Sequence, residues 1–181
     1  MPVTASITDV DRSLLIIEAG ERRMTWNGAA TPVNVIDELD HVHFTHGQCH
    51  ALALAVHEAT GWPLAGCNWT ALSNGEIPDH VFAVDPDGMS VDIFGRHRRG
   101  AHPDGALRDD WRALQPQDVL ALEVMGYDQA DVPYARRYVT AVLAGTVTRH
   151  RQGQPRPVPA RRLDRSRQLH LSQRPRLRRR T

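Results

Sequence analysis

Three residues in the first hundred have the types that a thiol hydrolase uses, and they occur in a usable order: Cys49, His80 and Asp92. A thiolate is the reactive form of cysteine, and the N-terminus of a helix or a neighbouring imidazolium lowers the pKa of a thiol. Cys49 follows Gly47 and Gln48 where the chain is expected to enter a helix, so its sulfur would lie in the first helical turn. The sequence therefore predicts an activated thiol.

The register of a predicted hairpin decides whether His80 and Asp92 can meet. Residues 86–87 fit the centre of a type I turn, and Gly88 fits the left-handed residue of a following bulge. In this register Phe82 faces Asp92, so His80 and Asp92 share one face as diagonal neighbours. A plain two-residue turn would place them on opposite faces. The other face is uniformly apolar and can cover a core: Val81, Ala83, Val91 and Ile93.

The elements that must position these residues indicate an α+β fold. Residues 49–60 are apolar on every side for most of their length and end at Gly61, which predicts a buried helix with a glycine stop. The hairpin spans residues 80–94. The other expected elements are hairpin strands over 13–18 and 22–26, a short helix over 31–40, a strand over 64–69, a polar loop over 72–79, and helices over 116–125 and 130–143.

Charge divides the chain of 181 residues into two parts. All 22 basic residues are arginines, and 11 of them follow position 150, where Asp164 is the one acidic residue. The segment is also rich in proline and poor in apolar residues, so burial of apolar surface cannot offset the loss of conformational entropy on folding. We expect one α+β domain of the catalytic type over residues 1–149 and a disordered basic tail over 150–181.

The composition bears on the compartment and on the cysteines. No apolar run approaches the roughly 18 residues needed to cross a bilayer, which excludes a membrane protein, and the first twenty residues do not read as a secretory signal. A cytoplasmic location is therefore expected. Two cysteines cannot form a disulfide framework, so both are expected as thiols, with Cys67 a residue of the core.

The segment from Gly47 to Gly95 resembles a known family. The runs GQCHALALAVHEATGWPLAG and DHVFAVDPDGMSVDIFG look like the core of the papain-like and transglutaminase-like cysteine hydrolases. The resemblance implies an α+β fold in which a central buried helix carrying the cysteine packs on an antiparallel sheet. It assigns Cys49 as nucleophile, His80 as general base and acid, and Asp92 as the residue that orients the imidazole.

Two departures from the family pattern concern the surroundings of the triad. Phe82 stands where many relatives have tryptophan, and no familiar oxyanion glutamine lies several residues before the cysteine. Gln48 and His46 are candidates for that role, beside the backbone N–H of Cys49. Trp62 is a candidate for lining a substrate groove.

The function expected from these residues is a cysteine hydrolase or acyl transferase acting on an amide bond of a protein or peptide through a thioester. Water as the acceptor gives a peptidase or deamidase, an amine gives a transamidase, and the sequence leaves this choice open. The chemistry requires no cofactor and no metal.

Two other interpretations use different residues. Four histidines crowd around Cys49 and could bind zinc with it: His41, His43, His46 and His50. Alternatively, the protein is a non-catalytic binding protein whose arginine-rich tail, residues 151–181, contacts nucleic acid or another polyanion through counterion release.

Overall fold

The computed structural model describes residues 9–73, 75–103 and 110–145 of the chain. These residues form an α+β fold around a five-stranded antiparallel sheet in the order β6-β5-β4-β1-β7, with a separate two-stranded sheet of β2 and β3. None of the described helices is long and apolar enough to cross a membrane. The predicted tail over 150–181 lies outside the described residues.

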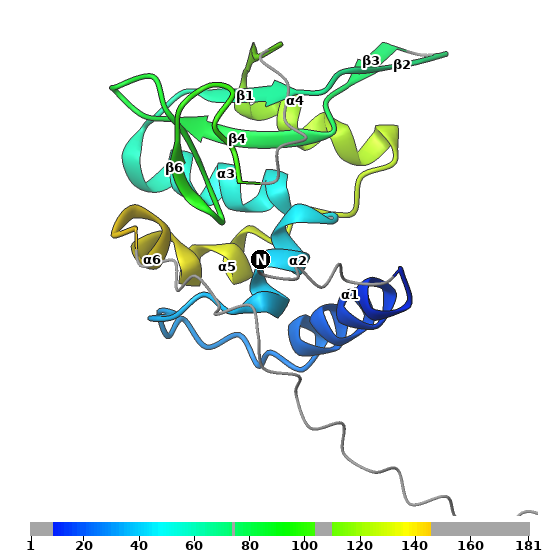
Figure 1. The fold of residues 1–181 in the computed structure, drawn as a ribbon, viewed down its shortest axis with the longest axis vertical. Coiled ribbons are helices and arrows are strands. Elements are labelled where there is room, and N and C mark those ends of the chain that lie inside the picture. The colour runs from blue at the N-terminus through cyan, green and yellow to red at the C-terminus, as the bar shows by residue number, and fades with distance from the viewer. Residues whose placement is uncertain (1–8, 74, 104–109, 146–181) are drawn as a thin grey trace, which may run out of the picture. The chain divides into compact units, whose positions relative to one another are not determined.

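The elements follow one another in this order: α1 Asp9–Met24, α2 Glu38–Thr45, α3 Cys49–Thr60, β1 Leu64–Cys67, β2 Thr70–Leu72, β3 Gly75–Ile77, β4 His80–Val84, β5 Ser90–Asp92, β6 Gly95–His97, β7 Arg112–Leu114, α4 Pro116–Ala121, the 3₁₀ helix η1 Leu122–Met125, α5 Val132–Ala135, the 3₁₀ helix η2 Arg136–Tyr138, and α6 Val139–Leu143. In Figure 1, α3 lies against one face of the sheet, and α2, α5 and α6 lie on the side of α3 away from the sheet.

Helix α3 has the bounds predicted from its sequence. Its residues from Cys49 to Val56 are all buried, which accounts for the lack of a polar face. Gly61 ends the helix in the left-handed conformation, with φ 73°, and its N–H donates to the carbonyl of His57 at 2.7 Å. The helix therefore fills the space between the sheet and the outer helices with alanine, leucine and valine side chains.

The β4–β5 hairpin has the predicted register. Val84 pairs with Ser90, Gly88 takes a left-handed φ of 74°, and the N–H of Asp85 donates to the carbonyl of Met89 at 2.9 Å. The predicted apolar face is fully buried in the core under the sheet: Val81, Ala83, Val91 and Ile93. The opposite face is thereby left to His80 and Asp92.

The hairpin predicted over residues 13–26 is wrong, because α1 covers most of this segment. Its apolar residues run consecutively and do not alternate as they would in a half-buried strand. As a helix the segment packs on α2 and buries Ala19. Arg22 then forms ion pairs with Asp37 at 2.8 Å and with Asp40 at 2.9 Å.

The short helix predicted over 31–40 begins later than expected. The carboxylate of Asp37 accepts hydrogen bonds from the N–H groups of Leu39 and Asp40, and Asp40 accepts one from the N–H of Asp37 in return. This capping box fixes the start of α2 at Glu38, so Pro32 lies outside the helix.

Other departures concern short elements. The predicted strand over 64–69 ends at Cys67, where Asn68 turns the chain with a φ of 56°. The predicted loop over 72–79 contains most of the β2–β3 hairpin, and strand β7 was not predicted. The helices predicted over 116–125 and 130–143 are each divided into short α and 3₁₀ segments.

Candidate active site

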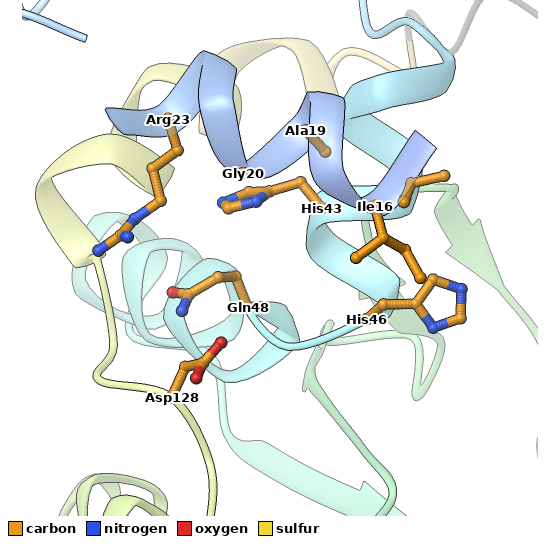
Figure 2. Close-up of a pocket in the computed structure, with 9 residues that line it drawn as sticks. Ile16, Ala19, Gly20, Arg23, His43, His46, Gln48 and Asp128 are labelled. Atoms are coloured by element: carbon orange, nitrogen blue, oxygen red, sulfur yellow. The ribbon is translucent and has the colours of Figure 1, made fainter. Parts of the chain in front are cut away.

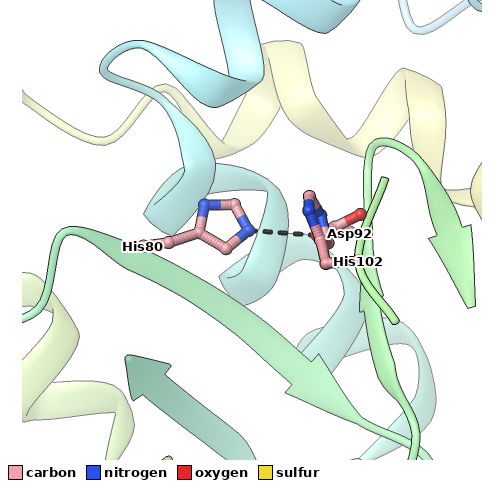
Figure 3. Close-up of side chains that lie close together, drawn as sticks. All are labelled: His80, Asp92 and His102. Carbon is pink, nitrogen blue, oxygen red and sulfur yellow. Dashed lines mark hydrogen bonds and ion pairs between the residues drawn. The ribbon is translucent and has the colours of Figure 1, made fainter. Parts of the chain in front are cut away.

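Three elements bring the candidate triad together. Cys49 is the first residue of α3, His80 is the first residue of β4, and Asp92 is the last residue of β5. The Nε2 atom of His80 donates to Oδ2 of Asp92 at 3.0 Å, and Figure 3 shows the ring of His80 directed toward this carboxylate. The thiol of Cys49 lies close enough to the same imidazole to raise its pKa. Since Nε2 of His80 is hydrogen bonded to Asp92, the nitrogen available to the sulfur is Nδ1.

The carboxylate of Asp92 has three hydrogen-bond donors. Besides His80, the Nε2 atom of His102 lies 2.8 Å from the same Oδ2 atom, and the N–H of Phe94 donates to Oδ1 at 2.8 Å. Burial by itself raises the pKa of Asp92, but the hydrogen bonds and charges of His102 and His80 outweigh it and hold the pKa well below its usual range. The side chain is therefore a buried anion.

The protonated form of His80 is strongly favoured. Burial lowers the pKa of this imidazole, but the hydrogen bond to Asp92 and the contact with Cys49 have the larger, opposite effect. The pKa is therefore raised from its ordinary value to about 10. A protonated ring that is 5 % exposed needs compensating negative charge. Asp92 on one side and the ionised thiol on the other side supply that charge.

The two thiols of the chain differ in their ionisation. Burial raises the pKa of Cys49, but the neighbouring imidazoles of His50 and His80 outweigh it and lower the pKa to about 6. The partial positive charge at the start of α3 acts in the same direction. Burial, with the nearby acids Asp110 and Asp79, raises the pKa of Cys67 to about 12. Cys49 is thus the reactive thiol of the pair, and Cys67 is buried in the sheet.

A cavity of about 410 Å³ borders Cys49. It is lined by residues from the loop before α3, from the β3–β4 connection and from the segment after η1, among them His46, Asp79, Tyr127 and Asp128. The cavity gives a carbonyl compound room to approach the sulfur. His46, a candidate from the sequence, is an exposed residue of this lining.

The other two candidate substrate residues have structural contacts. Gln48 is buried, and its amide donates to the carbonyl of Gln129 and accepts from the N–H of Asp131, both at 3.0 Å. Its side chain therefore ties the start of α3 to the segment before α5. Trp62 lies just beyond the other end of α3, packed against the core, and is absent from the lining of the cavity at Cys49. Its predicted place in a substrate groove beside Cys49 is not supported, since a twelve-residue helix separates the two.

A second, smaller cavity of about 150 Å³ lies between α1 and the residues around α2 (Figure 2). His43, Gln48 and Asp128 line it, and Arg23 stands at its edge, where its guanidinium pairs with Asp131 at 2.8 Å. Cys49 does not line this cavity, although His46 and Asp128 line both cavities.

The histidines between 41 and 50 do not form the zinc cluster considered from the sequence. His41 stacks on Phe94 with ring centroids 4.6 Å apart, and Nε2 of His50 bonds to the carbonyl of Asp128 at 3.0 Å. Burial lowers the pKa of His43 to about 4, so this ring is neutral. Within the described ranges, these rings do not converge on a common point.

A different donor group does converge, and it includes a residue that the sequence reasoning missed. One ligand atom each from His80, Asp92 and His102 lies within 4.8 Å of the others. His102 comes from the loop after β6, and no local pattern connects it with the hairpin. The repeated histidines at His97 and His102, close after Asp92, were the available signal.

Comparison with known proteins gives no assignment: no family model, no curated protein and no solved structure matches this chain.

Proposed function

We propose that the protein is a cysteine-dependent hydrolase or acyl transferase that acts on amide bonds of a protein or peptide. The observation that carries this proposal is the buried 3.0 Å hydrogen bond between His80 and Asp92, with the thiol of Cys49 close to the same imidazole. The order of the three residues and their places on a helix start and on adjacent antiparallel strands also support membership of the papain-like and transglutaminase-like hydrolases.

In the proposed reaction, the thiolate of Cys49 attacks the carbonyl carbon of the amide and forms a tetrahedral intermediate. The first N–H groups of α3, beginning with that of Cys49, have no acceptor within the helix and can donate to the oxyanion. The imidazolium of His80 gives its proton to the leaving nitrogen. The C–N bond then breaks, and a thioester of Cys49 remains.

In the second half of the reaction, neutral His80 accepts a proton from the attacking group, and the thioester is broken. Asp92 keeps the ring oriented and stabilises its protonated form throughout. Water as the acceptor yields cleavage or deamidation, and an amine yields a new amide. Nothing in this scheme needs a cofactor. The competing interpretation as a polyanion-binding protein depends on residues 151–181, outside the described part.

A peptide mixture tests the proposal. The full chain and a Cys49→Ala variant are each incubated with peptides from a digested proteome, and new termini, deamidated side chains and cross-links are identified by mass spectrometry. We expect products of one of these kinds with the wild type and with a Cys67→Ala control, but not with Cys49→Ala. Equal product formation by Cys49→Ala would contradict the proposal.

A further inference from the structure

We propose that His80, Asp92 and His102 form a binding site for a divalent transition-metal ion, with Zn²⁺ as the best-suited ion. Two imidazole nitrogens and one carboxylate oxygen, all within 4.8 Å of one another, are the donors. Such a set suits Zn²⁺, which binds neutral imidazole and carboxylate and brings no redox chemistry next to a thiol.

Two of the three donor separations are close to those of a zinc site. Ligand atoms of tetrahedral Zn²⁺ lie roughly 3.3 Å apart, given bond lengths near 2.0–2.1 Å. Oδ2 of Asp92 already lies 3.0 Å from Nε2 of His80 and 2.8 Å from Nε2 of His102. The ion would replace the protons of these two hydrogen bonds and draw together the two nitrogens, which lie within 4.8 Å of each other.

The carboxylate is held in the orientation that the ion needs. The N–H of Phe94 donates to Oδ1 of Asp92 at 2.8 Å, which directs Oδ2 toward both imidazoles. This is the kind of outer hydrogen bond that fixes a metal ligand. The three side chains are only 6 %, 3 % and 5 % exposed, so an ion bound there would be largely shielded from solvent.

Cys49 would not be a ligand in this site. Its sulfur is outside the group of donor atoms that lie within 4.8 Å of one another. The Nε2 atom of His80 is directed at Asp92, which leaves Nδ1 of the ring for the thiol. This distinguishes the site from the simple chelation of Zn²⁺ by a cysteine and a histidine.

Occupancy has a consequence for the reaction, which rests on the proposed function. An ion on Nε2 of His80 leaves the ring proton on Nδ1, facing the sulfur. That proton can still stabilise the thiolate, but giving it to a leaving nitrogen would create an imidazolate. Zn²⁺ therefore stops amide turnover while the thiolate remains open to alkylation.

The test of the site uses Zn²⁺ alone and the full chain after removal of metal with a chelator and dialysis. Calorimetry measures binding to the wild type and to three variants: Cys49→Ala, His102→Ala and His46→Ala. The last variant is the matched control, because it removes an exposed histidine outside the donor group. Co²⁺ binding, followed by its absorption spectrum, reports whether a thiolate is a ligand.

We expect one equivalent of Zn²⁺ in the wild type, in Cys49→Ala and in His46→Ala. Affinity in His102→Ala should fall by more than about tenfold, since loss of an outer-shell partner alone costs roughly 10- to 100-fold. A His102→Gln variant guards against misfolding, with circular dichroism as the check. Unchanged binding in both His102 variants, loss of binding in Cys49→Ala, or a sulfur-to-cobalt absorption band would overturn the site.

Failure of the site and failure of the proposed function are distinguishable. One equivalent bound through His102 in a protein without amide products would leave the metal site intact and remove the hydrolase. Amide products with no Zn²⁺ binding would leave the hydrolase intact and remove the metal site. With both in place, Zn²⁺ should abolish amide turnover and leave iodoacetamide alkylation of Cys49 within about threefold; suppression of alkylation would contradict the arrangement of ion and thiol.

Discussion

Replacing His80 with alanine should remove the reactivity of Cys49 near pH 6. The pKa of Cys49 is about 6, so half of it is thiolate at that pH, against roughly 0.3 % of an ordinary thiol. This gives about 160 times more thiolate, while the lower basicity costs roughly 10- to 20-fold in nucleophilicity. A net advantage of about tenfold remains. In His80→Ala the sulfur stays buried and loses the charge of the His80 imidazolium, so most of the advantage disappears.

The assay is the alkylation rate with iodoacetamide between pH 5 and 9, in the presence of a chelator, followed by peptide mass analysis. Cys67 is the internal control, since burial and nearby acids raise its pKa to about 12. The difference between wild type and His80→Ala should be largest near pH 6 and should narrow as the pH rises. A His80→Gln variant guards against loss of the fold. Equal rates at pH 6 in a folded variant would refute the reasoning.

Four further substitutions test other parts of the structure. Asp92→Asn removes the negative charge that two imidazoles share, so amide turnover should fall by at least about a hundredfold while circular dichroism stays unchanged; turnover within a few fold of wild type would exclude the orienting role. Gly88→Ala should lower the free energy of unfolding, measured with denaturant, by about 1–2 kcal/mol, because φ is 74° there. Gly20→Ala lies inside α1 with open space around it and should raise the free energy of unfolding by roughly 0.5–1 kcal/mol. The opposite order of stabilities would contradict the assigned backbone. Gly66→Ala should lower the free energy of unfolding by about 1–3 kcal/mol, because its new methyl group would stand 2.7 Å from the Pro78 ring. An unchanged unfolding midpoint would contradict this close contact.

The parts of the site that the sequence predicted are those determined by local signals. Gly61 defines the end of α3, and the apolar run before it can only be buried. Gly88 selects the bulged turn, and the turn fixes the register that places His80 and Asp92 on one face. Each signal lies within a few residues of the element that it controls, so reasoning from spacing was sufficient.

The parts that the sequence did not predict depend on distant contacts. His102 reaches Asp92 from a loop whose path no periodicity describes. In α1, Leu14 and Ile17 are exposed and Ala19 is buried, so the apolar residues do not mark the buried face of the helix. The ion pairs of Arg22 join this helix to Asp37 and Asp40, which are distant in the sequence. Tertiary contacts of this kind override local preference.

The most direct test of the proposed chemistry is detection of an acyl group on Cys49. The full chain is mixed with a short peptide thioester, quenched in acid, and mapped by mass spectrometry. Because the chain contains no lysine, an acyl group cannot be moved to a side-chain amine during the analysis. We predict one hydroxylamine-sensitive acyl group on the peptide containing Cys49, absent from Cys49→Ala. Acylation of Cys67 to the same extent, or none on Cys49 in the folded protein, would contradict the proposed nucleophile.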